Sequence, residues 1–354
     1  MAINLMSKYA KPINEAYEYE SILAGKTSKR FNWDGVRGIT TTNIVTVPLT
    51  TYNRATTSNR FGGQNEVQDE QQYMELQWDL SVALTVDKGN YKEGEELKTA
   101  GVLVHDEMNE QINPEVETKA LEAWAKNAGQ YLTITDDDDG ALILRDLMKI
   151  EAAFKNKRVP TANRFAAVDA NLMPYLRAAL TNCDDITDKM IMKGIVGRIG
   201  TLNIIEVPHG DMPTNCWILA WQEKSVYLPK TIMDCDLHNK PENFSGLLVN
   251  FRHRFGAFVD MKYCNGVVAV LASGNQATAV TAGSTNNRTL DLNSNDYGYY
   301  TLDGSDPRYS KTAVKITADK TFTSTEAPNG TVIKFVTWNT GKTYPSAVTS
   351  ATVG

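Results

Sequence analysis

The chain has 354 residues, of which 42% are hydrophobic and 22% are charged, so it is globular and long enough for two or three domains. Its formal net charge of −6 argues against a basic nucleic-acid-binding surface, and no apolar run approaches the length of a membrane span. The first residues lack the apolar core of a signal peptide, and the four cysteines are widely spaced without a CxxC pair, as expected of reduced thiols in a protein made in cytoplasm.

Residues 1–37 are expected to form a short N-terminal arm. Met6, Tyr9, Ile13 and Tyr17 recur at helical spacing, which predicts a helical turn or two. A strand-rich region begins directly after this arm.

The most informative stretch is residues 74–87, where every even position is a large apolar residue and the odd positions are polar or small. This alternation predicts one long strand with a buried face and a wet face. Residues 38–53 are rich in Thr, Ile and Val and predict a partner strand, so residues 38–87 are expected to form a long two-stranded arm. The apolar stripe needs cover from another element or another subunit, because an isolated ribbon is marginal in water. An ordinary strand folded onto its own domain is the alternative.

A long helix is predicted over residues 95–128, where apolar or small residues recur every three or four positions. Asn113-Pro114 lies within it. Because Pro is tolerated in a first helical turn with Asn as its cap, this pair marks either a kink or a restart. A second helix with one apolar face is predicted over residues 141–156.

An acidic run, Asp136 to Asp139, precedes the second helix. Asp137, Asp139, Gly140 and Asp146 fall near the ligand positions of an EF-hand calcium loop, although its first position would be Thr and its last Asp rather than Glu. Carboxylates at a helix N-terminus also accept hydrogen bonds from free backbone N–H groups. We favour this capping role, and calcium binding by Asp136 to Asp139 stays open.

Between residues 160 and 270 short strands and helices mix. Gly194, Gly197 and Gly200 mimic a phosphate loop, but GxxGxxG spacing without a following GK[ST] is better explained by close turns. Strands are predicted at 164–169, 202–207, 217–221, 247–251 and 267–271, and a helix at 171–180.

The sequence contains no HExxH, GxSxG or Cys/His pairing of useful spacing. We therefore predict that the protein is not an enzyme, and assign no catalytic, cofactor-binding or metal-binding residue and no cofactor. A zinc site that uses cysteines with His209 or His238 is a less favoured alternative.

Composition changes at about residue 273, where residues 273–287 read as a polar linker of small residues. Residues 288–354 are rich in Thr, Val and Asp-Gly or Asn-Gly turns with short alternating strands, which predicts a small β-sandwich. This segment contains no cysteine, so its core alone must hold it. Tyr299, Tyr300, Tyr309 and Trp338 could stack on sugars, although core or turn packing explains them better.

The order of arm, ribbon, long helix and mixed region, together with four stretches of sequence, resembles the major capsid protein of tailed bacteriophages, whose fold encapsulins share. The stretches are RFAAVDANLMPYLRAAL (164–180), MKGIVGRIGTLNIIEVP (192–208), CWILAWQEKSVYLP (216–229) and NFRHRFGAFVDMKYCNGVVAV (250–270). The resemblance covers about residues 30–272. It implies an α+β capsid fold with an N-terminal arm (1–37), an extended β-hairpin arm (38–87), and peripheral and axial domains with a spine helix (88–272).

The tail carries a second resemblance. YYTLDGSDPRYS (299–310) and IKFVTWNTGKTYPSAVTSATV (333–353) are similar to bacterial immunoglobulin-like domains of the chitobiase C-terminal type. This similarity implies an all-β immunoglobulin-like sandwich at residues 288–354, projecting as a knob from the outer surface of a shell.

Together the resemblances imply a structural protein whose hexamers and pentamers build an icosahedral shell around double-stranded phage DNA, which it touches without sequence readout. The expected location is the virion capsid, after synthesis in the bacterial host cytoplasm, with no membrane partner. The alternatives are an encapsulin-like cargo compartment and, from the tail alone, a carbohydrate-binding accessory protein.

Two departures from the family change the expected partners and chemistry. Some members carry a long N-terminal scaffolding segment, whereas only about 30 residues precede the ribbon here, so a separate scaffolding protein and a portal are expected. Some members crosslink through a lysine on the ribbon. This chain has no lysine between Lys29 and Lys88, so that crosslink is not expected.

Overall fold

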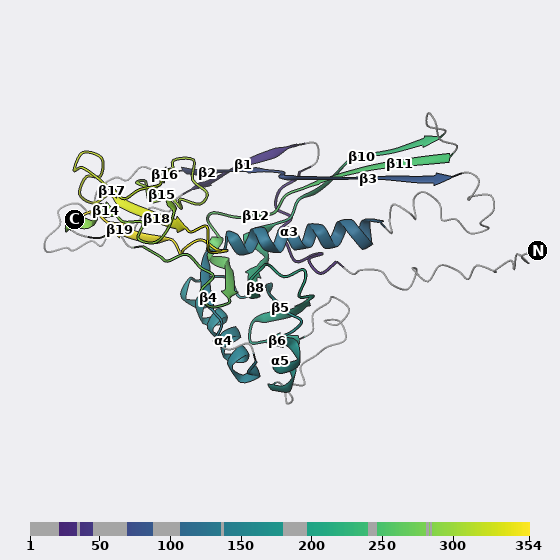
Figure 1. The fold of residues 1–354 in the computed structure, drawn as a ribbon, viewed down its shortest axis with the longest axis horizontal. Helices are drawn as coiled ribbons and strands as arrows, with labels where there is room; N and C mark the ends of the chain where they lie inside the picture. Colours follow the sequence, from purple (N-terminus) through teal and green to yellow (C-terminus); the bar gives the residue numbers. More distant parts are fainter. Residues whose placement is uncertain are drawn as a thin grey trace, which may run out of the picture. The chain divides into compact units, whose positions relative to one another are not determined.

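The structure is a computed structural model, and it describes residues 21–33, 36–44, 69–87, 107–135, 138–179, 197–239, 246–280, 283 and 285–354. These residues form a mixed α/β protein with several sheets and few helices (Figure 1). The chain divides into two compact units. The first unit consists of Met1–Gly35, Leu76–Val259 and Asn265–Ala272, and the second of Val36–Glu75, Asp260–Cys264 and Ser273–Gly354.

A six-stranded mixed sheet organises the first unit. The pairs β4–β13 and β5–β7 are parallel, and the other neighbours are antiparallel. Helices α4 (Gly140–Asn156) and α5 (Met173–Ala179) bury their apolar faces against this sheet, because their apolar residues recur at helical spacing. The strand order is β4 (Gln130–Thr133), β13 (Val267–Leu271), β8 (Cys216–Gln222), β5 (Arg164–Asp169), β7 (Leu202–Val207) and β6 (Gly197–Ile199).

A second, three-stranded sheet of long antiparallel strands belongs to the same unit. Its order is β10 (Lys230–Asn239), β11 (Gly246–Phe255) and β3 (Trp78–Asp87), and the three run side by side in Figure 1. The remaining strands of this unit, β9 (Val226–Tyr227) and β12 (Phe258–Val259), pair with each other.

The predicted long helix is present over its described part. A short π-helix, η2 (Met108–Ile112), continues into α3 (Asn113–Lys126), with Pro114 in the first turn of α3. Ile112 keeps right-handed helical backbone angles at the junction, so the helix changes its winding there rather than stopping. Residues 95–106 of the prediction lie outside the described residues.

The predicted two-stranded arm is wrong in its pairing. Strand β1 (Gly38–Ile44) pairs with β2 (Asp69–Glu75), as an upstream partner would, but the alternating stretch breaks at Leu76 and Gln77. Its second half, β3, pairs along its whole length with β11 instead. The ten-residue β11 offers a longer ladder, with apolar side chains on the matching face. Val45, Val47 and Leu49 lie outside the described residues.

The tail forms two antiparallel sheets in the second unit. The four-stranded sheet has the order β16-β15-β18-β19, and β14 pairs with β17. Side chains from both sheets share one buried cluster that includes Leu290, Tyr300, Phe322 and Phe335, so the predicted core is present. The strands are β14 (Thr289–Leu290), β15 (Tyr297–Thr301), β16 (Val314–Ile316), β17 (Lys320–Thr321), β18 (Val332–Trp338) and β19 (Thr349–Thr352).

The start of the tail packs with these sheets. Val280 belongs to the buried cluster, and Gln276 forms a β-bridge with Tyr344.

The described residues also contain short 3-10 helices at η3 (Glu223–Ser225), η4 (Cys264–Gly266) and η5 (Thr285–Asn287).

Candidate assembly surface

Helix α3 and the sheet β10-β11-β3 form a layer, called here the helix–sheet layer. Trp78, Leu80 and Val82 are half-buried, and they pack with Ile112 and Val116 in one apolar cluster. The odd residues of β3 between Asp79 and Thr85 are exposed. The alternation predicted from the sequence is therefore confirmed, and the same chain supplies part of the cover for its apolar stripe.

The opposite face of this sheet is charged. Asp79 accepts hydrogen bonds from Arg252 Nε at 2.9 Å and Arg252 Nη2 at 2.6 Å, and from Arg254 Nη2 at 3.0 Å. The hydrogen bond from Arg252 is the main reason that the pKa of Asp79 is lowered to about 2. Two guanidinium groups share one carboxylate, so this group of three carries a net positive charge.

The layer also has two edges. In the described part of the chain, β3 and β10 are the outer strands of their sheet. An edge strand presents backbone N–H and C=O groups that another chain can pair with. The layer thus combines two strand edges with a charged face.

The N-terminal segment at residues 21–33, called here the strap, lies on α3 and on strands of the first unit. Glu117 of α3 is 1% exposed and accepts hydrogen bonds from Ile22 N at 3.0 Å, Leu23 N at 3.1 Å and Ser21 Oγ. Backbone and side-chain donors thus bind the buried carboxylate and fix the start of the strap.

The strap is held further along its length as well. Lys26 O accepts a hydrogen bond from Trp221 Nε1 at 3.0 Å, and Ser28 N donates to Val226 O at 3.0 Å. Trp33 stacks on Phe258 with ring centroids 5.6 Å apart. Nothing in the sequence pattern marked Glu117, because an acidic residue on a helix usually faces water.

The capping role predicted at the acidic run is confirmed for Asp139. Its side chain accepts a hydrogen bond from Ala141 N at 2.8 Å at the start of α4. Asp146, the last position of the calcium alternative, is 1% exposed and accepts hydrogen bonds from Thr135 N and Thr135 Oγ1, each at 2.7 Å. Lys149 Nζ lies 2.6 Å from the same carboxylate. Asp136 and Asp137 lie outside the described residues.

The zinc alternative does not fit the residues that the structure describes. His209 Nδ1 lies 2.6 Å from Asp169 Oδ2, where β5 and β7 end. Cys216 is buried, and burial raises the pKa of its thiol to about 12, which disfavours a thiolate ligand. Among the described residues no group of three or more His, Cys, Asp or Glu side chains could hold a metal ion. The side chain of His238 lies outside that part.

The glycine-punctuated segment is a turn where the structure describes it. Gly197 begins β6, and Gly200 has φ of +58° in the tight turn between β6 and β7. Gly194 lies outside the described residues. The preference for a turn over a phosphate loop is therefore confirmed at Gly200.

The tail aromatics divide into two groups. Tyr300 is in the core against Phe322, and the Arg308 guanidinium lies over the ring of Tyr309. The second group, called here the aromatic cluster, is partly exposed. In it Tyr297 and Trp338 stack with centroids 5.7 Å apart, and Tyr299 meets Trp338 edge-on at 5.2 Å. Packing thus accounts for all four predicted residues, while the cluster keeps some exposed ring surface.

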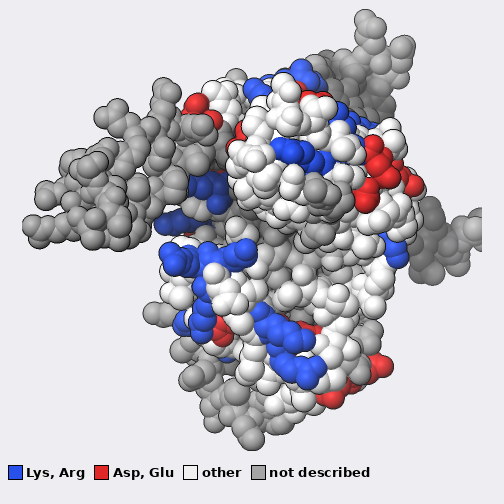
Figure 2. Space-filling view, turned by 90° about the vertical axis from the view of Figure 1, so that its left-hand side faces the viewer, with Lys and Arg blue, Asp and Glu red and all other residues white. Residues whose placement is uncertain are grey.

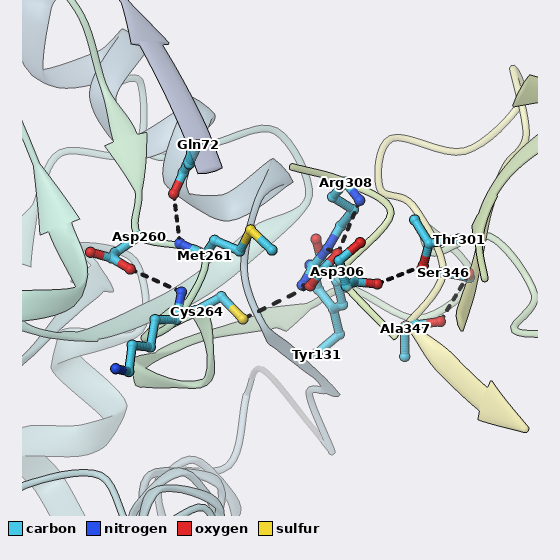
Figure 3. A network of polar contacts seen from close by, with 12 residues as sticks. Gln72, Tyr131, Asp260, Met261, Cys264, Thr301, Asp306, Arg308, Ser346 and Ala347 are labelled. Atoms are coloured by element: carbon cyan, nitrogen blue, oxygen red, sulfur yellow. Dashed lines mark hydrogen bonds and ion pairs between the residues drawn. The ribbon is translucent and has the colours of Figure 1, made fainter. Parts of the chain in front are cut away.

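Within the second unit, the loop Asp260–Cys264 contacts both the β1–β2 hairpin and the tail (Figure 3). Met261 N donates a buried hydrogen bond of 2.8 Å to Gln72 Oε1. Cys264 Sγ lies 3.9 Å from Asp306 Oδ2, and the buried Arg308 guanidinium holds the same carboxylate at 2.7 Å. The loop therefore joins the hairpin and the tail in one unit.

The comparisons with known proteins address the fold. No protein-family model and no curated protein matches the chain. Solved structures do match. A chain from the structure of Mycobacterium phage Che8 has a TM-score of 0.59 at 14% identity, over 76% of this chain and 98% of that chain.

Two further matches come from capsid structures. A chain of the cyanophage P-SCSP1u capsid has a TM-score of 0.57 at 12% identity, over 76% of this chain and 93% of that one. A chain of the bacteriophage PhiM1 mature capsid has a TM-score of 0.54 at 11% identity, over 76% and 92%. This protein therefore has the fold of chains found in phage capsid structures.

Proposed function

We propose that this chain is the major capsid protein of a tailed bacteriophage, which self-assembles into the icosahedral shell around a double-stranded DNA genome. The likeness to capsid chains carries the proposal, because it extends over 76% of this chain and almost the full length of the matched chains. A structural rather than catalytic role follows, with the virion capsid as the location after synthesis in the host cytoplasm. Among the described helices none is long and apolar enough to cross a membrane.

The helix–sheet layer supports assembly by its chemistry. Its edge strands can pair with a neighbouring copy, and its Arg252–Asp79–Arg254 face can meet an acidic neighbour. Each such contact is weak. Repeated in every hexamer and pentamer of a closed lattice, these contacts give a strong shell.

The further partners are a separate scaffolding protein, a portal and packaged DNA. The DNA would meet the shell without sequence readout, which suits a chain of net charge −6. On the face drawn in Figure 2, Lys and Arg side chains cover more of the surface than Asp and Glu side chains, which form smaller groups. We expect only weak, salt-sensitive contact with the genome.

The tail is proposed to be an outward-facing immunoglobulin-like domain, and Gln276 and Val280 of the predicted linker at 273–287 pack with it. It has its own apolar core between two sheets. It also makes up roughly a quarter of the chain, which is close to the share that the matched chains leave uncovered. An addition to the capsid fold accounts for both observations.

Negative-stain electron microscopy of the purified full-length chain tests the proposal. Closed shells, or hexamers and pentamers that appear as concentration rises, are the expected result. Single subunits at every concentration would overturn it. Nuclease-protected DNA inside particles isolated from cells supports a phage capsid, whereas an enclosed enzyme supports an encapsulin-like compartment. Boiled particles should give one band near 39 kDa, because the ribbon offers no lysine for a crosslink.

A carbohydrate-binding accessory role is the second candidate, and the aromatic cluster favours it. Rings such as Tyr297, Tyr299 and Trp338 can stack on the apolar faces of sugars. Retention of the full chain on insoluble chitin or peptidoglycan, lost in Trp338→Ala, would support this role. No retention, together with shell formation, would reject it.

A further inference from the structure

A histidine lies in the middle of the helix–sheet layer. His253 of β11 is 2% exposed, and its ring stacks between the rings of Phe251 and Phe255. The centroid distances are 6.3 Å and 5.9 Å, and the planes are inclined by only 10° and 22°. Its partner on β3 is Leu80. His253 is therefore the only titratable member of an aromatic row that faces α3 within the described residues.

This position gives the imidazole little polar support. Among the described residues Nδ1 of His253 has no hydrogen-bond partner, although it is buried. The neighbouring cluster consists of Ile112, Val116 and the two Phe side chains, with Trp78 and Leu80 at its margin. A neutral imidazole fits among these groups, whereas an imidazolium would be a buried cation without a paired anion.

The charges around this position come from three elements. Lys230 of β10 is positive and lowers the proton affinity of His253, while Asp79 of β3 raises it. Glu117 of α3 is held by the strap and acts on Lys230 rather than on the imidazole. Burial is the largest effect, and together these groups lower the pKa of His253 from 6.5 to about 4.

We propose that His253 makes the contact between α3 and the sheet β10-β11-β3 an acid-sensitive joint, in which protonation of the imidazole disfavours the packed state. Above pH 6.5 the imidazole is neutral whether the joint is packed or open, so packing is fully stable. As pH falls from 6.5 towards about 4, the open form binds a proton and the packed form does not. The packed state therefore loses stability over this window. The inference concerns the single chain and does not depend on the proposed function.

The first test reads the protonation of His253 directly. The full-length chain, labelled with 13C at histidine, has four imidazole Cε1–H signals, which histidine-to-glutamine variants assign one by one. The His253 signal is expected to begin shifting only below pH 5. A His253 signal with a titration midpoint near pH 6.5 would overturn the proposal. This titration is measured on the wild-type chain and does not require that a His253 variant folds.

The second test measures stability in denaturant at pH 7.5 and pH 5.0. Because the open form alone is protonated in this range, the folded-to-unfolded ratio of the wild type should fall by on the order of 30-fold more than that of His253→Gln. Phe251→Leu is the matched control, since Phe251 lies in the same aromatic row as His253 and does not titrate. The stability of this control variant should fall between pH 7.5 and pH 5.0 by as much as that of the wild type. Equal losses in the wild type and His253→Gln would contradict the proposal.

The third test locates the region of the protein that acid destabilises. Hydrogen exchange, corrected for the intrinsic pH dependence, should accelerate at pH 5.0 in peptides from β3 and β11 before it does so in β5. In His253→Gln the two regions should respond alike. If hydrogen exchange accelerated equally in both sheets of the wild type, the protein would be unfolding as a whole in acid, and the proposed joint would be contradicted.

Discussion

Trp78 of β3 stacks on Phe255 of β11, its partner in the antiparallel register, with ring centroids 5.1 Å apart and planes inclined by 24°. The pair lies where β3 begins, directly after the break at Leu76 and Gln77. A slip of one residue would turn Trp78 to the face that carries Asp79 and the two arginines. The stacked pair therefore fixes the register of the whole ladder.

Replacing Trp78 with Asp should weaken the helix–sheet layer and abolish shells. A carboxylate at this half-buried position loses the stacking on Phe255 and adds a desolvation penalty, so we expect a loss of about 2–3 kcal/mol in the free energy of unfolding. Chemical denaturation and electron microscopy measure the two effects. Ser81→Asp, on the exposed face of the same strand, is the control and should change stability little. Normal shells from Trp78→Asp would contradict the assembly role of the layer.

Replacing Glu117 with Gln should release the strap. The amide keeps the size of the side chain but sets an NH2 group against backbone donors, at a cost of about 1–3 kcal/mol. Limited proteolysis should then cut residues 21–33 much faster than in the wild type. Glu115→Gln, two residues away on the same helix and half exposed in its pair with Lys119, should leave the cleavage rate unchanged. If both variants behave alike, the strap does not depend on Glu117.

Asp146 provides a test that combines pH with metal binding. Burial raises the pKa of Asp146, but hydrogen bonds from Lys149 and Thr135 outweigh it, so the pKa is lowered overall. Asp146 therefore contributes stability that is present above its ordinary value of 3.8 and is lost as pH falls through its lower folded value. Asp146→Asn should cost about 1–3 kcal/mol at pH 7 and reduce this acid dependence. Since Asp146 is occupied by protein donors, millimolar calcium or chelator should not move the melting temperature, and a calcium-dependent rise would revive the EF-hand alternative.

Ending the chain after Ser273 should preserve assembly and remove external density, if the tail is an outward-facing addition. The structure adds a local readout for the same variant. Cys264 is buried and contacts Asp306 of the tail, so its thiol should react faster with a thiol reagent once the tail is gone. Cys216, buried in the six-stranded sheet, serves as the internal control. Loss of assembly from a folded truncated chain would make the tail part of the lattice.

Local patterns in the sequence predicted the elements that pack on one sheet. The strand at 164–169 coincides with β5, and the helix at 141–156 differs from α4 by its first residue alone. Both predictions succeed because the apolar side chains of each element recur in a regular pattern and each element ends at a clear turn or cap. The predicted pairing of β3 was wrong because its partner β11 lies far along the chain. The alternation of apolar and polar residues shows which face of a strand is buried but does not identify the partner strand.

The polar residues of the helix–sheet layer could not be recognised from sequence patterns either. Glu117 reads as an ordinary surface carboxylate, and only the folded position of Ile22 and Leu23 reveals its role. His253 lies beyond the predicted strand at 247–251, whereas β11 extends to Phe255, and nothing in the sequence shows that the imidazole faces α3. Charged and titratable side chains acquire their function from neighbours that are distant in sequence, so spacing alone cannot find them.

The chain passes between its two compact units five times, and this threading has consequences for synthesis on the ribosome. Val36–Glu75 emerges early, whereas its partners in the second unit, from Ser273 onwards, emerge last. At roughly 5–20 residues per second, the β1–β2 hairpin waits on the order of 10–40 s before the first residues of the tail are synthesised. During that interval the hairpin, whose Met74 is buried in the finished protein, lacks the rest of its unit. A chaperone that binds nascent chains is therefore expected to bind this hairpin during synthesis.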